Sequence, residues 1–263
     1  MLTEQRKQHI LDVLRRDGRV VAKTLAAALS LSEDTIRRDL RELAREGLLQ
    51  RVHGGALPAS RAAGDFGARQ ALSTVEKAAI GRAAAAMIRP GQVVFVDGGT
   101  TAVQLARALD RRLEATIVTH SPSVAVELID HAAEVILIGG RLFKHSMVAV
   151  GAAAMEAIGR IHADTYFMGV TGIHPEIGLT TGDPEEAAIK RALVAAAAET
   201  IVLGSPEKLG AASPFVVTPA REIAVLLTTD TVPPEQVEPY ERLGAVVVRT
   251  PLVDLKLARW SGM

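Results

Sequence analysis

The most informative segment of the chain is Ser32-Glu-Asp-Thr-Ile-Arg-Arg-Asp-Leu-Arg-Glu-Leu-Ala-Arg-Glu-Gly47. Its apolar residues predict one helix, because Ile36, Leu40 and Leu43 fall on the same face at about 100° per residue. Ser32 suits the N-cap position, and the acidic residues after it favour the positive end of the helix dipole. The outward half of this helix carries Thr35, Arg38 and Arg41, with Arg37 at its edge.

Shorter elements on both sides of this helix predict a DNA-binding fold. Apolar periodicity predicts helices over residues 2–16 and 21–29, with a turn at 30–31 before the basic helix. Residues 48–52 favour a strand and residues 53–56 a turn. This order is typical of a winged helix-turn-helix domain, which we assign to residues 1–57 and which binds double-stranded operator DNA. The alternative is a small helical bundle whose arginines form a solvated face. The candidate DNA-binding residues are Ser32, Thr35, Arg37, Arg38, Arg41, Arg51 and His53.

The composition excludes several classes of protein. The chain has 263 residues, 30 basic and 30 acidic, and no cysteine, which excludes a disulfide scaffold, thiolate metal sites and a cysteine nucleophile. Residues 1–58 hold eleven basic and eight acidic residues, a local charge of +3. Neither a signal peptide nor a membrane-spanning run is present, which predicts a cytoplasmic protein with no membrane partner. The seven histidines have no helical metal-site spacing, and we predict no metal, cofactor or catalytic residue.

The rest of the chain is predicted to form a linker and an α/β domain. Residues 58–74 lack sustained periodicity and are assigned to the linker, and residues 75–263 to the domain. Near-continuous apolar runs are typical of parallel strands buried on both faces. They occur at residues 92–97, 115–119, 134–138, 164–168, 200–203, 223–227 and 245–248. Helices are expected over residues 76–88, 101–109, 123–129 and 185–198, so the sheet is expected to be mostly parallel.

Glycine and polar residues gather where several of these strands end, which is where parallel sheets bind ligands. The first strand runs into Asp97, Gly98, Gly99, Thr100 and Thr101 before a helix, a pattern that suits an anion such as phosphate. Asp97 is a candidate acceptor for sugar hydroxyls. Each feature alone is compatible with a plain strand-to-helix turn or a core residue. The further candidates at strand ends are Thr119, His120, Ser121, Gly139, Gly140, Arg141 and Lys208.

These motifs resemble the DeoR family of bacterial transcriptional regulators. In the first domain the resemblance rests on Thr35-Ile-Arg-Arg-Asp-Leu40 and His53-Gly-Gly-Ala56, and in the second on Asp97-Gly-Gly-Thr-Thr101. It implies a second domain related to ribose-5-phosphate isomerase, and a repressor of sugar or polyol catabolism genes that a phosphorylated sugar releases from DNA. It also adds Glu186 to the ligand-binding candidates. His120 replaces the family's asparagine and Gly204 its aspartate, so sugar contacts must differ there.

Two other functions compete with this one. The first is a sugar-phosphate isomerase with an appended DNA-binding module, which needs a carboxylate base. The acidic candidates are Asp97, Glu176, Asp183, Glu185 and Glu186, but Thr171 stands where the resemblance requires a carboxylate. The second is a DNA-binding protein whose large domain only oligomerises. Because recognition helices commonly act in pairs on two half-sites, we expect a homo-oligomer, a dimer or tetramer.

Overall fold

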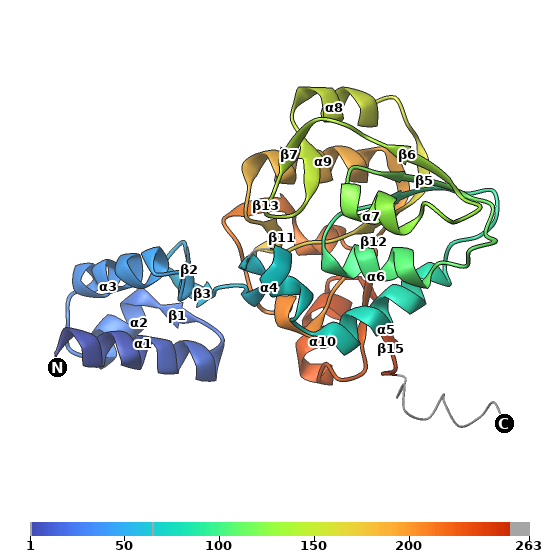
Figure 1. The fold of residues 1–263 in the computed structure, drawn as a ribbon. Coiled ribbons are helices and arrows are strands. Elements are labelled where there is room, and N and C mark those ends of the chain that lie inside the picture. The colour runs from blue at the N-terminus through green and yellow to red at the C-terminus, as the bar shows by residue number, and fades with distance from the viewer. Residues whose placement is uncertain (1, 65, 253–263) are drawn as a thin grey trace.

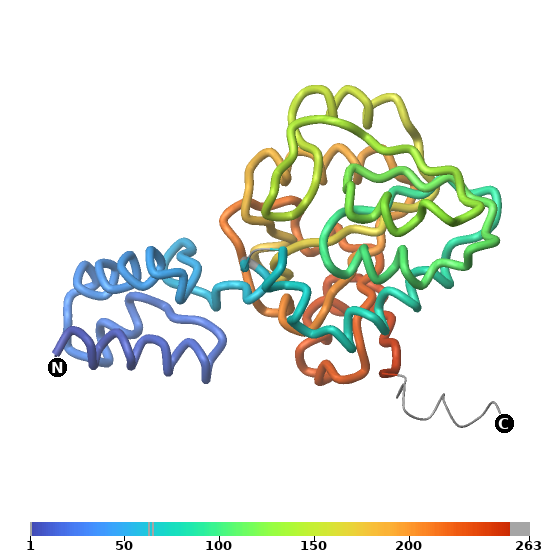
Figure 2. Tube along the Cα trace, viewed as in Figure 1, coloured from blue at the N-terminus to red at the C-terminus, as the bar shows by residue number. Residues whose placement is uncertain are grey.

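The computed structural model describes residues 2–64 and 66–252, which form two bodies connected by one segment of chain (Figure 1). The smaller body holds the N-terminal helices and lies to one side of the larger one, as the tube in Figure 2 shows. Residues 253–263, which belong to the predicted second domain, lie outside the described residues.

The smaller body has the predicted helical order and two strands, over residues 20–21 and 55–58, that the sequence did not predict. An antiparallel sheet in the order β1-β3-β2 packs beside its helices, and Ile10, Ile36 and Leu40 are buried at the centre. This arrangement confirms the predicted winged helix-turn-helix. Its elements are α1 (Thr3–Asp17), β1 (Val20–Val21), α2 (Ala22–Ala28), α3 (Glu33–Arg45), β2 (Leu49–Val52) and β3 (Gly55–Pro58).

The turn predicted over residues 53–56 is shorter than expected. Only His53 and Gly54 form it, and Gly55 already pairs with Val21 of β1, a strand that the sequence did not predict. A Cβ atom on Gly55 would lie 1.8 Å from the carbonyl oxygen of Val20. Glycine is therefore required here, because it lets β1 approach β3.

Residues 58–74, the predicted linker, contain the short helical elements η1 (Arg61–Ala63) and α4 (Phe66–Gln70). The hydroxyl of Ser60 caps η1 by accepting the amide of Ala62 at 3.1 Å. An element of three to five residues is too short to show apolar periodicity in a sequence. The segment thus has local structure that pattern alone does not reveal, and the exact domain boundaries stay a prediction.

In the described part of the larger body, the main sheet has seven parallel strands, in the order β15-β14-β12-β9-β4-β5-β6. Each corresponds to one of the predicted apolar runs, which confirms the expected α/β fold. Consecutive residues alternate between the faces: Phe95 packs on one side, and Val94 and Val96 on the other. The strands are β4 (Val93–Val96), β5 (Thr116–Thr119), β6 (Glu134–Leu137), β9 (Ala163–Met168), β12 (Ala197–Leu203), β14 (Val225–Thr229) and β15 (Val246–Thr250).

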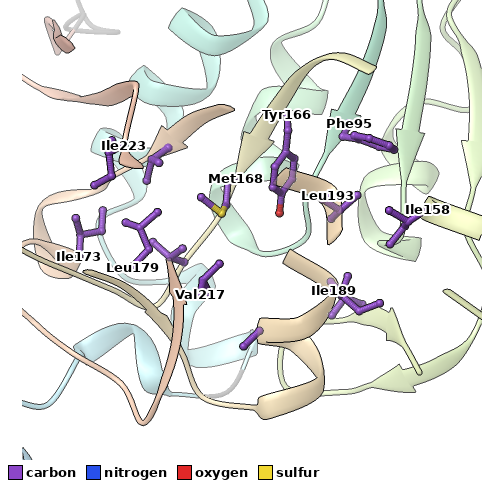
Figure 3. Packing of buried hydrophobic residues seen from close by; sticks show 14 of the residues in the cluster. Phe95, Ile158, Tyr166, Met168, Ile173, Leu179, Ile189, Leu193, Val217 and Ile223 are labelled. Carbon is purple, nitrogen blue, oxygen red and sulfur yellow. The ribbon is translucent and has the colours of Figure 1, made fainter. Parts of the chain in front are cut away.

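Helices cover both faces of this sheet (Figure 1). Residues of α5 (Thr74–Ala85), α6 (Thr100–Ala108) and α7 (Pro122–Glu127) form the core on one face. The core of the other face includes residues of α8 (Ala152–Ile158) and α9 (Pro184–Ala195). Figure 3 shows this second core, in which the Tyr166 ring lies between Phe95 and Met168.

Several short elements of the larger body escape sequence prediction, because three or four residues show no clear alternation. They form the β7–β8 hairpin, a sheet in the order β10-β11-β13, and connecting turns. The helices over residues 152–158 and 234–242 were not predicted either. No described helix is long and apolar enough to cross a membrane. The described residues contain no cluster of three or more side chains suited to a metal ion. The additional elements are β7 (Arg141–Phe143), β8 (Val148–Val150), β10 (Gly172–His174), β11 (Gly178–Thr181), η2 (Pro206–Lys208), β13 (Phe215–Thr218), η3 (Ala220–Glu222) and α10 (Pro234–Arg242).

Candidate DNA-binding and ligand-binding sites

The basic helix α3 begins and packs as its sequence predicts. Ser32 is the N-cap, because its hydroxyl accepts the Thr35 amide at 3.2 Å and lies 2.9 Å from the Thr35 hydroxyl. Ile36, Leu40 and Leu43 are buried in the small core. Ser32 and Thr35 therefore fix the start of the helix, where the first backbone amides face outward.

A buried ion pair holds α3 against α1. The Arg6 guanidinium donates through Nη2 to Asp39 Oδ1 at 3.0 Å and through Nε to the second carboxylate oxygen. Both residues are at least nine-tenths buried. A two-pronged contact of this kind fixes orientation as well as distance. Asp39 thus sets the direction of the recognition helix rather than contacting a ligand.

The other charged candidates on this body point into solvent. Arg38 and Arg41 of α3 are exposed, as are Arg51 of β2 and His53 of the wing turn. Arg37 is also exposed, but its guanidinium already pairs with Glu33 at 2.7 Å. The outer half of α3 therefore presents guanidinium groups that are free to reach base edges or phosphates in a major groove.

A small cavity lies at the carboxyl ends of β4 and β9, where the direction of strand addition reverses. From β4 the sheet continues to β5 and β6 on one side, and to β9 and the later strands on the other. Parallel sheets bind ligands at such a point. The cavity volume is about 20 Å³, and the lining residues are Arg69, Gly98, Gly99, Thr101, Ser146, Gly169, Val170, Thr171, Glu186, Lys190 and Lys208.

One wall of the cavity is the start of α6. Gly99 is the N-cap with φ of 95°, and the first amides of the helix have no acceptor within the helix itself. The position that a Cβ on Gly99 would occupy is 4.0 Å from Arg69 Nη1. Backbone amides and a guanidinium therefore converge at the helix start, which is the arrangement that binds an anion.

Gly98 leaves no room for a side chain. A Cβ at this position would lie 2.1 Å from Val148 Cγ1 and 3.3 Å from Ser121 Cβ. We expect Gly98→Ala to lower the free energy of unfolding by about 1–3 kcal/mol, the usual cost of overpacking a core. Chemical denaturation measures this loss. Gly139→Ala is the matched control, because nothing lies within 4 Å of its Cβ position; equal stability of the two variants would contradict the packing argument.

Asp97 lies behind the cavity wall and accepts hydrogen bonds from several elements. Its side chain is fully buried. Its Oδ1 accepts from the Gly98 amide at 2.7 Å and faces His120 Nε2 at 2.9 Å. Its Oδ2 accepts from Tyr166 at 2.8 Å, from the Gly169 amide at 2.8 Å and from Lys190 Nζ at 2.5 Å. Both oxygens are therefore occupied by the protein, and the predicted contact with sugar hydroxyls has no support in this geometry.

The charge of this carboxylate follows from its partners. Burial raises the pKa of Asp97, but the Lys190 ammonium and the His120 ring together outweigh burial and hold that pKa below its usual range. Asp97 is therefore an anion that holds two cavity-wall glycine amides and a cavity lysine in place.

The predicted residues after β5 form a supporting layer. His120 Nδ1 contacts the Ala149 carbonyl at 3.0 Å, and its other nitrogen faces Asp97. The Ser121 hydroxyl donates to the Met147 carbonyl at 3.0 Å, and Thr119 accepts the Ser121 amide at 3.1 Å. All three residues are buried and none lines the cavity formed by the described residues. The histidine that departs from the family pattern thus supports Asp97 and the β7–β8 hairpin.

Several cations surround the cavity. Lys208 Nζ donates to the Leu203 carbonyl at 3.2 Å and lies 3.5 Å from the Thr101 hydroxyl. Burial lowers the pKa of Lys208 to about 8. The Glu207 carboxylate raises the pKa of Lys208, whereas three neighbouring cations lower it further: Lys77, Arg69 and Lys190. A bound anion would therefore stabilise the charged form of Lys208.

The remaining predicted residues divide into two groups. Glu186 lines the cavity, accepts from the Thr181 hydroxyl, and lies 3.5 Å from Lys190. Gly139, Gly140 and Arg141 are exposed and are absent from the lining, and Arg141 pairs with Glu185 instead. The loop after β6 therefore lies apart from the cavity at the carboxyl ends of β4 and β9.

Sequence reasoning missed several lining residues. Lys190 lies four residues after Glu186 on an alanine-rich helix, and this charged pair was a usable signal. Arg69 lies on the short helix α4 and Ser146 in the turn between β7 and β8, and the sequence of neither segment offered a signal. The Ser146 hydroxyl is buried and has no hydrogen-bond partner among the described residues. At Gly204 a Cβ would lie 2.7 Å from Leu226 Cδ1, so a neighbouring leucine occupies the space of the family's aspartate.

Both bodies match known protein families. Residues 6–62 match the DeoR-like helix-turn-helix domain, and residues 72–230 match the DeoR C terminal sensor domain. The chain is 36% identical over 251 residues to the HTH-type transcriptional regulator GlpR of Haloferax volcanii, covering 94% of this chain and 98% of the relative. It is 34% identical over 212 residues to the glycerol-3-phosphate regulon repressor of Escherichia coli K12, covering 80% and 84%.

Among solved structures, the chain is similar to ribose 5-phosphate isomerase A of Methanocaldococcus jannaschii, with 15% identity and a TM-score of 0.38 over 56% of this chain and 57% of that one. The full-length relatives are named as regulators or repressors of transcription. With both domains matched and nearly its whole length shared with such proteins, the chain belongs to the DeoR family: it is a DNA-binding transcriptional regulator and not an enzyme.

Proposed function

We propose that the chain represses genes of sugar or polyol catabolism in the cytoplasm, and that a phosphorylated sugar bound at the start of α6 releases it from operator DNA. The observation that carries this proposal is the cavity itself, where helix amides, Arg69 and Lys208 converge. A relative of this chain is named for the glycerol-3-phosphate regulon, which favours the same class of ligand. Half-site recognition favours a dimer or tetramer.

The balance of buried charge supports an anionic ligand. Among the described residues, four buried basic side chains gather here against three buried acidic ones, a surplus of one positive charge. A buried cation is stabilised by an anion that approaches it, so this set of side chains favours an anionic ligand. The basic residues are Arg69, Lys77, Lys190 and Lys208, and the acidic ones are Asp97, Glu186 and Glu207.

The test measures operator affinity in the presence of candidate ligands. The operator is a DNA duplex that the protein selects from a random pool. The complex of protein and duplex is then titrated with glycerol 3-phosphate, fructose 1-phosphate, glucose 6-phosphate and ribose 5-phosphate. We expect at least one to weaken DNA binding and to raise the melting temperature, since a ligand at 100 times its Kd adds about 2.7 kcal/mol. The unphosphorylated sugars are the control. If no phosphorylated compound stabilised the protein, a large domain that only oligomerises would be the better explanation.

The pKa of Lys208 predicts how ligand affinity depends on pH. A phosphate ester is a dianion above about pH 6, and Lys208 is protonated below about pH 8. Affinity should therefore be highest between these values and fall as the pH rises from 8 to 9.5, because the ammonium loses its proton. Calorimetry in buffers of different ionisation enthalpy should show proton uptake on binding at pH 8. The Lys208→Gln variant should show no uptake, and an affinity independent of pH above 7 would contradict the assignment.

A further inference from the structure

Resting on the proposed function, we propose that residues 58–64 and 66–70, which lie between the two bodies, form the coupling element of the repressor. In this proposal Arg69 contacts the bound anion directly. Ser60 passes the change in the cavity to the wing of the DNA-binding domain. The observations that follow concern the two ends of this segment and the cavity between them.

The first end of the segment continues the wing without a break. Strand β3 ends at Pro58, and the next residue, Ala59, forms a parallel bridge with Ala212 of the larger body. The Ala212 amide donates to the Pro58 carbonyl at 3.4 Å. The last residue of strand β3 therefore accepts a hydrogen bond directly from the sensor domain.

Ser60 connects this end to the cavity wall. It is buried, and its hydroxyl donates to the carbonyl oxygen of Thr171, a cavity residue. The same hydroxyl caps η1, which packs against η2, the turn that carries Lys208. The cavity residue Thr171, and the turn that carries the cavity residue Lys208, thus contact the segment within a few residues of the wing.

The other end of the segment contributes to the cavity itself. Arg69 of α4 is buried, lines the cavity and donates to the His145 carbonyl. Lys77 of α5 fixes the end of α4, because its ammonium donates to the carbonyls of Arg69 at 2.8 Å and Leu72 at 2.6 Å. A ligand that moves Arg69 therefore acts on a segment that is anchored behind it and leads forward to the wing.

The cavity is too small to bind a phosphate ester without moving part of its wall. Its volume of about 20 Å³ suits about one water molecule. The wall made by Gly98, Gly169 and Lys190 is held by Asp97. The lining also includes Arg69 and Ser146, and the buried hydroxyl of Ser146 has no hydrogen-bond partner among the described residues. Expansion is therefore expected on the side of the connecting segment.

The junction leaves room for the smaller body to move. A cleft of about 500 Å³ lies beside the segment, between Arg19 of the smaller body and His174 and Gln236 of the larger one. The ion pair across it joins Arg19 to Glu176 at 3.2 Å, with both side chains at least 60% exposed. An exposed pair of this kind holds the bodies weakly, whereas the connecting segment is hydrogen-bonded to the larger body at Pro58 and Ser60.

The test compares Ser60→Ala with the wild-type full-length chain. For each, operator affinity is measured with and without the panel compound that acts most strongly on the wild type, and with inorganic phosphate. Wild-type coupling is expected in the usual range of about 5- to 150-fold. We expect Ser60→Ala to bind the ligand within about twofold of wild type while its coupling falls by at least fivefold. Ser60→Thr keeps the hydroxyl and should restore coupling, and Ser123→Ala, on α7 beside β5 and β6, should leave it unchanged.

The possible outcomes separate this proposal from the proposed function. If no phosphorylated compound affects the wild type, the proposed function fails. If the wild type responds and Ser60→Ala responds equally, or loses response only because it binds ligand poorly, the coupling proposal is overturned. Should Ser60→Ala not fold, hydrogen exchange of the wild type decides: ligand-dependent protection of residues 58–63 supports the proposal, and unchanged protection overturns it.

Discussion

An Asp97→Asn variant is expected to lose about 3–5 kcal/mol of unfolding free energy, the usual cost of removing one partner from a buried ion pair. The Lys190 ammonium would remain buried, and its one remaining charged partner among the described residues would be Glu186, at 3.5 Å. The new amide also carries hydrogens of its own. In one orientation they meet the Gly98 amide and His120, and in the other they meet Tyr166 and Lys190. In either orientation, the amide hydrogens of the new asparagine face a neighbouring hydrogen-bond donor.

Chemical denaturation at pH 7 measures this loss, and Asp164→Asn is its matched control. Asp164 lies at the amino end of β9 on the same sheet, is exposed, and accepts the Val93 amide at 2.8 Å. Its substitution should cost about 1 kcal/mol or less. A loss of similar size in both variants would show that Asp97 does not hold the cavity wall together.

The same pair predicts how the loss depends on pH. The folded pKa of Asp97 is lowered, so its stabilising contribution is fully present above the unfolded pKa of about 3.9. It is lost as the pH falls through the lower, folded value. The stability difference between wild type and Asp97→Asn should therefore be constant from pH 5 to 8 and shrink only below about pH 4.

Local patterns in the sequence were sufficient for the main sheet and for the recognition helix. A buried parallel strand needs apolar residues on both faces, so Val93–Val96 was recognisable without knowledge of its neighbours. The N-cap at Ser32 and the apolar face of α3 are equally local. What made these elements predictable is that their stabilising contacts repeat at a fixed spacing within the element.

The cavity depends on strand order, which no local pattern contains. The loops at four strand ends were predicted to converge, but β6 is the edge strand, so Gly139–Arg141 lies two strands from β4. The neighbour of β4 on the other side is β9, whose loop supplies Gly169 and Thr171. Asp97 likewise accepts hydrogen bonds from Tyr166 and Lys190, which are 69 and 93 residues away in the sequence. Arg69 comes from a segment with no periodicity at all.

The double variant Arg38→Ala/Arg41→Ala is expected to weaken operator binding by about 30-fold or more. Each guanidinium that contacts a base edge or phosphate contributes about 1–3 kcal/mol, and two such losses add when the contacts are independent. Both side chains are exposed on the outward half of α3, so their removal leaves the core of Ile36, Leu40 and Leu43 intact. The melting temperature should therefore stay close to that of the wild type.

The control is Arg15→Ala/Arg16→Ala on α1, which removes the same charge from the same domain. Those side chains are about 70% exposed and pair with Asp12 and Asp17. Fluorescence anisotropy at several salt concentrations separates the possible roles of the α3 arginines. A phosphate contact lowers the slope of log affinity against log salt by about one per arginine, whereas a base contact reduces discrimination between operator and random DNA.

Arg37 refines this prediction, because its guanidinium already pairs with Glu33 at 2.7 Å and lies 3.8 Å from Asp34. Contact with DNA must first break these interactions, so Arg37→Ala should weaken binding less than Arg38→Ala. If the α3 double variant bound the operator as well as the α1 control does, then α3 would not be the recognition helix. The buried Arg6–Asp39 pair would then orient a helix that does not enter the groove, and DNA contact would fall to the wing.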